Sequence, residues 1–190
     1  VTLDNRPTAG QLEVLLERAC QLHAPDDLSP LRSSAEAQGQ HGSGSEELPV
    51  LVARTWAETA EVLELLRRDL DAMHIPALAL DLEGMLRYYG SIDLIQIATD
   101  RHIFLLDMIH SGPNAALDDE DHGLRAILKD ERITKVLHAG ISDVITLQSC
   151  YGITITSCFD TSVAHGVLVN NPNICLGLGK TTERYLNLEL

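Results

Sequence analysis

Hydrophobic and polar positions divide the chain into three parts. Residues 8–22 place leucine and alanine side chains at helical spacing, which predicts a short amphipathic helix within an N-terminal segment, 1–23. Residues 24–47 are rich in Ser, Gly, Gln, Pro and acidic side chains, a composition typical of flexible linkers. From position 48 to 190 apolar runs return, and we expect the globular domain there.

Predicted strands and helices alternate within this domain. The pattern predicts strands over 50–53, 77–82, 94–99, 102–106, 134–138 and 154–158, and helices over 55–73, from 124, over 142–149 and over 161–169. The strands 94–99 and 102–106 flank Asp100 and Arg101 and form a predicted hairpin. A hairpin followed by strand–helix–strand units indicates an α/β domain with a mixed sheet flanked by helices.

Composition and charge exclude several classes of protein. The chain has 190 residues, 45% of them hydrophobic, and no run of about 18 apolar residues that would cross a bilayer, so we expect no membrane association. Its net charge of −14 argues against broad electrostatic capture of nucleic acid. The first 48 residues carry 8 acidic and 3 basic side chains, and so −5 of that charge. Four scattered cysteines without zinc-ligand spacing favour a reducing, intracellular compartment, cytoplasmic or nuclear.

Two carboxylates end the most hydrophobic strand. In ALALDLEG, Asp81 and Glu83 are two positions apart and therefore point to the same side of the strand. Ionised carboxylates beside a buried strand are costly unless a cation or a hydrogen-bond donor compensates. Mg²⁺ or Mn²⁺ would suit an oxygen-only pair. The alternative is that both side chains simply end the strand and face water.

A third acidic position follows the strand KVLH. Asp143 stands in the first turn of the predicted helix after Gly140, where a carboxylate also suits the helix dipole. His138 ends the strand close to the expected site, either as a partly buried structural histidine or as a substrate contact.

The ordered set ALDLEG, LIQIAT (94–99), KVLHAGISD and CFDT (158–161) resembles the DEDD superfamily of 3′–5′ exonucleases. Within that superfamily the chain is similar to the ribonuclease D-like branch and to Egalitarian-type exonuclease-domain proteins. The resemblance covers the chain from about Val50 onward and implies a ribonuclease H-like fold with a five-stranded mixed sheet. It also implies two Mg²⁺ or Mn²⁺ ions, about 3.5–4 Å apart, at the scissile phosphate.

Residue by residue, the resemblance implies that Asp81, Glu83 and Asp143 are catalytic metal ligands. The family pattern also needs a fourth carboxylate in a YxxxD or HxxxxD motif, and neither motif follows Asp160. We therefore expect a C-terminally truncated domain that lacks its third catalytic motif. Asp160 itself is better explained as the N-cap of the helix that follows, with a ligand role as the alternative.

The segment after DLEGML offers a possible contact for substrate. Arg87, Tyr88 and Tyr89 combine a cation with two aromatic faces, on which unpaired bases stack in single-strand binders. A surface loop with packed tyrosines is the alternative.

Two functions follow from these expectations. The first is a 3′–5′ exonuclease domain acting on a single-stranded 3′ end, with RNA favoured over DNA. The second is a catalytically inactive RNA-binding or adaptor module. A protein partner would bind through the N-terminal helix or the acidic surface.

Overall fold

The computed structural model describes residues 48–112, 116–117, 123–171 and 174–187. The predicted N-terminal helical segment and linker, residues 1–47, lie outside these ranges. The strands are β1 (Val50–Ala53), β2 (Ala77–Met85), β3 (Ser91–Ala98), β4 (Ile103–Asp107), β5 (Thr134–Leu137) and β6 (Cys158–Asp160). The helices are α2 (Trp56–Ala72), α3 (Met108–Ser111), α5 (Leu124–Lys129), α6 (Ile141–Tyr151), α7 (Thr161–Leu168) and α8 (Leu178–Leu186).

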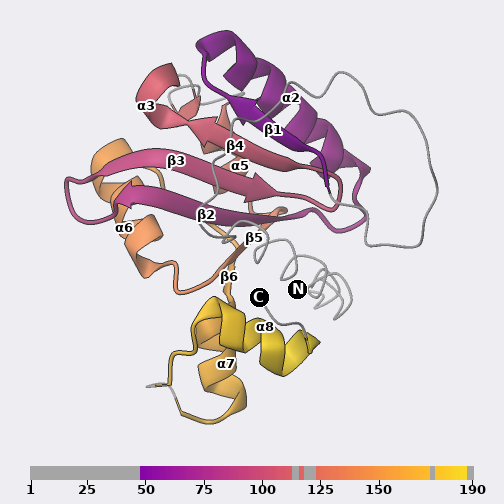
Figure 1. The fold of residues 1–190 in the computed structure, drawn as a ribbon, viewed down its shortest axis with the longest axis vertical. Coiled ribbons are helices and arrows are strands. Elements are labelled where there is room, and N and C mark those ends of the chain that lie inside the picture. The colour runs from indigo at the N-terminus through magenta and orange to yellow at the C-terminus, as the bar shows by residue number, and fades with distance from the viewer. Residues whose placement is uncertain (1–47, 113–115, 118–122, 172–173, 188–190) are drawn as a thin grey trace.

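The strands form one mixed sheet in the order β1-β4-β3-β2-β5-β6 (Figure 1). Strand β3 runs antiparallel to both β2 and β4, whereas the pairs β1–β4, β2–β5 and β5–β6 are parallel. The predicted hairpin is confirmed as β3–β4. The sheet has six strands, one more than the resemblance implies, because β1 pairs along the outer side of β4.

The last strand begins later than the sequence pattern predicts. Residues 154–156 do not pair with the sheet and instead pass along the end of α5, where the Thr156 amide donates to the Leu128 carbonyl at 3.1 Å. The Thr156 hydroxyl donates to the Lys129 carbonyl at 2.9 Å, and the Ser157 hydroxyl donates to the Glu131 carbonyl at 2.7 Å. These bonds fix the segment to the turn after α5. The Ser157 carbonyl accepts the first bond from β5, from the Lys135 amide at 3.0 Å, and the paired register begins at Cys158.

Helix α2 packs against β1 and β4, at the edge of the sheet opposite to β5 and β6. A capping box between Thr55 and Glu58 starts it. Helical spacing places Trp56 on the same apolar face as Leu63, Leu66 and Leu70, which predicts burial, yet Trp56 is 67% exposed, because it is the first residue of the helix. The buried face includes Asp69 instead, whose Oδ2 accepts a hydrogen bond from the Thr99 hydroxyl at 2.7 Å and so ties α2 to the β3–β4 turn.

The hydrophobic core lies between the central strands and the helices. All four residues of the run Ala77–Leu80 in β2 are buried, as the sequence predicts for a central strand. Around them gather fully buried side chains from neighbouring elements, including Leu66, Ile95, Phe104, Leu128 and Leu147. Strand β2 is thus held on both faces up to the point where its acidic residues begin.

Helices α7 and α8 contact each other and lie beyond β6, at the lower end of the molecule in Figure 1. None of the helices in the described part of the chain has the length and apolar character needed to cross a membrane.

One lysine is fully buried in this fold. Lys135 of β5 donates from Nζ to the carbonyls of Asp130 and Ile133 at 2.7 and 2.9 Å. Burial lowers the pKa of the Lys135 ammonium from 10.5 to about 8, against the opposing charges of Cys158, Asp130 and Glu131.

The pKa of Lys135 predicts how stability depends on pH. Between pH 8 and 10.5 the unfolded chain keeps a proton on Lys135 that the folded chain has lost, so stability rises with pH in this window. Urea unfolding of the parent and of Lys135→Met should therefore diverge, with a rise of at most about 3 kcal/mol that only the parent shows. Equal pH profiles for the two proteins would contradict the lowered pKa.

Candidate active site

Asp81 and Glu83 lie where β2 leaves the core. Asp81 is partly buried and pairs across the strand with Gln96, and Glu83 is exposed and pairs with Leu94. A β-bulge between Glu83 and Gly84 shifts the register immediately afterwards. Gly84 has a φ of +142°, and a Cβ there would lie 2.5 Å from the Ser91 carbonyl oxygen, so the bulge requires glycine. Bulges beside a site redirect the neighbouring side chain, here Glu83.

Gln96 orients Asp81. Its side chain is 6% exposed, and its Nε2 donates to Asp81 Oδ2 at 3.0 Å. The sequence leaves the role of this amide open, although it is the single long polar side chain in the apolar strand LIQIAT. The structure shows that it holds one oxygen of Asp81 against β3.

Asp143 reaches the same strand from α6. It is the third residue of that helix, is 7% exposed, and its Oδ1 accepts a hydrogen bond from the Leu82 amide at 3.1 Å. The backbone bond therefore brings Asp143 to the residue between Asp81 and Glu83. Burial raises the pKa of the Asp143 carboxyl, the two backbone donors oppose this, and the nearby charges of Glu83 and Asp160 raise it further.

Asp160 is the N-cap of α7, as the sequence predicts. Its Oδ1 accepts from the amides of Ser162 and Val163 at 2.9 and 3.2 Å. The same carboxylate also accepts from the amides of Ala139 and Gly140. Both oxygens are therefore engaged by backbone donors, which favours the capping interpretation over a ligand role.

His138 faces α7 and the segment before α8. Its Nδ1 lies 2.7 Å from the Thr161 hydroxyl oxygen, and its Nε2 lies 2.9 Å from the Leu176 carbonyl oxygen. These contacts match the structural interpretation of His138 given by the sequence. Its role as a substrate contact stays a prediction.

Arg87, Tyr88 and Tyr89 form the turn between β2 and β3. The two tyrosines are 68% and 87% exposed, with ring centroids 6.2 Å apart. Gly90 closes the turn, since a Cβ there would lie 1.8 Å from the Met85 carbonyl oxygen. The exposure of both rings contradicts the alternative in which they pack on the domain.

Helix α6 holds this turn as well as Asp143. The Thr146 hydroxyl lies 3.4 Å from the Arg87 carbonyl oxygen, and Cys150 Sγ lies 3.3 Å from the Gly90 carbonyl oxygen. Helix α6 thus carries Asp143 and also contacts the backbone of the turn on either side of the two tyrosines.

The three acidic side chains fit a divalent cation in their chemistry but not in their present spacing. Among the described residues, no three His, Cys, Asp or Glu side chains are gathered closely enough to hold a metal ion. Asp81, Glu83 and Asp143 nevertheless offer only carboxylate oxygens, the donors that Mg²⁺ and Mn²⁺ prefer. The negative surroundings of the buried Asp143 would be relieved by such an ion.

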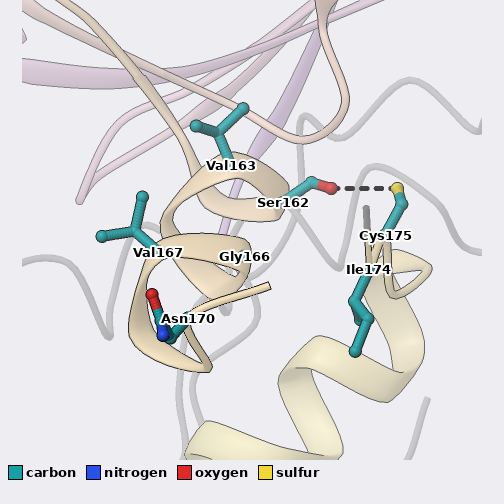
Figure 2. Close-up of a pocket in the computed structure, with 7 residues that line it drawn as sticks. All are labelled: Ser162, Val163, Gly166, Val167, Asn170, Ile174 and Cys175. Atoms are coloured by element: carbon teal, nitrogen blue, oxygen red, sulfur yellow. Dashed lines mark hydrogen bonds between the residues drawn. The ribbon is translucent and has the colours of Figure 1, made fainter. Parts of the chain in front are cut away.

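A separate groove runs beside α7 (Figure 2). It is lined by Ser162, Val163, Gly166, Val167, Asn170, Ile174 and Cys175. The Ser162 hydroxyl oxygen and Cys175 Sγ lie 2.9 Å apart at its wall (Figure 2). None of the predicted site residues lines this groove, and it adds no carboxylate or base to the acidic site.

Comparisons with known proteins place this geometry in a class. Among curated proteins, the chain is 34% identical over 113 residues to RRP6-like 3 of Arabidopsis thaliana, which covers 60% of this chain and 12% of that protein. It is 31% identical over 116 residues to ribonuclease D of Cronobacter turicensis, which covers 60% and 29%. The structure of Escherichia coli RNase D superposes with a TM-score of 0.59 at 27% identity, over 75% of this chain and 35% of that one.

The fold is therefore that of the ribonuclease H-like nucleases. A family model described as 3′-5′ exonuclease matches residues 54–190, and the chain belongs to this family. This confirms the resemblance to the ribonuclease D-like branch. The narrower similarity to Egalitarian-type proteins stays a prediction. The chain spans about an eighth of the Arabidopsis relative, so what the whole protein does is a matter for proposal.

The Asp143–Leu82 bond predicts a difference between two substitutions. Without added metal, Asp143→Asn should be no less stable than the parent, because the amide oxygen can still accept from Leu82 and the buried charge is gone. Asp143→Ala should be less stable than Asp143→Asn by about 1–3 kcal/mol, since it leaves the Leu82 amide without its acceptor. Urea unfolding measures both. Equal stability of the two variants would contradict the role of this bond.

Proposed function

We propose that this domain takes part in removing nucleotides from the 3′ end of single-stranded RNA, with Asp81, Glu83 and Asp143 as ligands of two Mg²⁺ or Mn²⁺ ions. The observation that carries the proposal is the buried carboxylate of Asp143, hydrogen-bonded to the backbone between the other two. The charges that act on it, Glu83 and Asp160, are both negative. A divalent cation would offset this repulsion, which the backbone donors to Asp143 oppose only in part.

The ligands have different degrees of freedom. Gln96 fixes Asp81 and the Leu82 amide fixes Asp143, so two of the three carboxylates are held before any ion binds. Glu83 is exposed at the bulge and can adjust when the site fills. Bound divalent ions would activate a water molecule and stabilise the charge that develops on the scissile phosphate. The side chains of this chain would hold and orient the groups at which that chemistry occurs.

The exposed turn would bind the substrate strand. Tyr88 and Tyr89 offer exposed rings next to Arg87, and unpaired bases stack on such rings. Because α6 contacts this turn and also carries Asp143, bound bases would lie at a fixed place relative to the carboxylates. A role for His138 beside the strand belongs to the same proposal.

RNA is the favoured substrate because two relatives are named as exonucleases, one of them for RNA processing. The Escherichia coli structure is described as an exoribonuclease involved in structured RNA processing, and a yeast relative is named as an exonuclease of the exosome complex. A structure of the EXD2 exonuclease domain was soaked in Mn and GMP, which supports the choice of metal. The exosome name of the yeast relative also supports a protein partner, bound through the N-terminal segment or the acidic surface. An intracellular site of action, expected from the cysteine pattern, belongs to the same proposal.

The family match favours an exonuclease over a catalytically inactive adaptor. The resemblance also implies a fourth carboxylate, and no YxxxD or HxxxxD motif follows Asp160 in this sequence. A nuclease assay of this chain would therefore not separate a failed metal site from the effect of the missing motif. Metal binding tests the site directly.

We expect calorimetric titration with Mn²⁺ to give binding heat for the parent chain, and Asp81→Asn to weaken that binding at least tenfold, because a ligand is lost. Asp71→Asn, an exposed acidic position at the end of α2, is the control and should bind as the parent does. If the parent gave no heat, the proposed metal site would be ruled out.

We expect Tyr88→Ala combined with Tyr89→Ala to weaken binding of a labelled single-stranded RNA, measured by fluorescence anisotropy. Each lost base contact would cost roughly 1–3 kcal/mol, so the dissociation constant should rise at least fivefold. Both rings are exposed, and unfolding stability should not change. Trp56→Ala removes an equally exposed ring from α2 and serves as the control. Unchanged affinity of the double variant would mean that the turn is not a substrate contact.

A further inference from the structure

We infer that Asp160 is the positioning residue for Asp143, because its carboxylate holds the turn from which α6 begins and so sets the place of Asp143. The importance of this for activity rests on the function proposed above. The placement itself rests on hydrogen bonds alone.

Four backbone amides converge on the Asp160 carboxylate. Two belong to the start of α7, where Ser162 and Val163 donate to Oδ1. The other two come from the turn after β5, where Ala139 donates to Oδ1 at 3.1 Å and Gly140 donates to Oδ2 at 2.9 Å. A helix cap needs only the first pair. The second pair joins the beginning of α6 to the beginning of α7.

The turn that receives this second pair has an unfavourable backbone. Ala139 has a φ of +53°, the left-handed region that non-glycine residues seldom adopt. At the next position, a Cβ on Gly140 would lie 2.8 Å from Leu137 Cδ2 and 2.9 Å from Leu137 Cβ. Such a turn persists only when its surroundings hold it. The two bonds to Asp160 supply that restraint.

What the turn determines is where α6 starts. Gly140 is the N-cap of α6 and makes no side-chain capping bond of its own. Asp143 follows three residues later and bonds the Leu82 amide on β2. The strand register places Asp160 beside Leu137, so its carboxylate lies next to the end of β5. The position of Asp143 against β2 thus depends on the side chain of Asp160, which belongs to β6, two strands away from β2.

A second bond reinforces the same junction. The Thr161 hydroxyl donates to the Leu137 carbonyl at 3.1 Å, which ties the first residue of α7 to the last residue of β5. The negative charge of Asp160 also lies close enough to raise the pKa of Asp143. A neutral cap would avoid this repulsion. The carboxylate offers a second strong acceptor, which the hydroxyl of serine or threonine lacks.

Two substitutions separate positioning from capping. Asp160→Ser keeps a side-chain oxygen for the cap of α7, but its one hydroxyl cannot also accept from Gly140. Asp160→Ala removes both functions. Thr55→Ala removes the N-cap of α2, which packs at the opposite edge of the sheet, and is the control for general loss of stability. Each variant of the 190-residue chain is followed by the amide NMR signal of Leu82, by Mn²⁺ calorimetry and by urea unfolding.

If Asp160 positions Asp143, then Asp160→Ser shifts the Leu82 amide signal and weakens Mn²⁺ binding about tenfold or more, as loss of supporting hydrogen bonds does at other metal sites. Thr55→Ala lowers stability and changes neither reading. A folded Asp160→Ser protein with the parent's Leu82 signal and Mn²⁺ affinity would overturn the inference. If the parent binds no Mn²⁺ while Asp160→Ser still shifts the Leu82 signal, the positioning role stands and the metal site falls.

Discussion

The hydrogen bond from the Leu82 amide to Asp143 brings the acidic site together. It joins a helix to the middle of the central strand, at a residue flanked by Asp81 and Glu83. The bond places a carboxylate in a buried position close to other negative charge, where burial raises its pKa. A fold that only needed stability would favour a neutral side chain there. An acidic residue at this position fits the proposed metal site, where a bound cation would offset the buried negative charge.

Each neighbouring feature supports that arrangement from a different direction. Gln96 restrains Asp81 from β3, and the bulge at Gly84 turns the strand directly after Glu83. Helix α6 carries Asp143 at one end and contacts the tyrosine turn further along. The net charge of −14 argues against long-range attraction of a nucleic acid, but it is spread over the whole chain. Recognition of a strand end would depend instead on the few side chains ordered at this site.

Much of this architecture could be predicted from the sequence because its signals are local. The apolar run Ala77–Leu80, the hairpin β3–β4 and the N-cap Asp160 each follow from short patterns, and the structure confirms them. The burial that helical spacing predicts for Trp56 is wrong, because periodicity does not show which residue of an apolar face lies at the exposed end of a helix. The predicted start of the last strand at residue 154 is wrong, because residues 156 and 157 bond the turn after α5, which is far away in the sequence, and β6 begins only at Cys158.

The acidic site shows the same contrast between local signals, which the sequence reveals, and long-range contacts, which it does not. The sequence indicated Asp81, Glu83 and Asp143, but the partners that place them are long-range. Gln96 lies 15 positions from Asp81, and Leu82 lies 61 positions from Asp143. The second pair of donors to Asp160 comes from 20 and 21 positions upstream. No spacing rule connects such pairs, because they meet only when β2, β5 and β6 have assembled.

Strand β6 has three residues and lies at the edge of the sheet. Short edge strands open locally more readily than central ones, at a free-energy cost below that of global unfolding. Each such opening would carry Asp160 away from the β5–α6 turn. The order of the acidic site is then limited by the opening equilibrium of the shortest strand, even though β2, which carries two of the acids, lies in the most protected part of the domain.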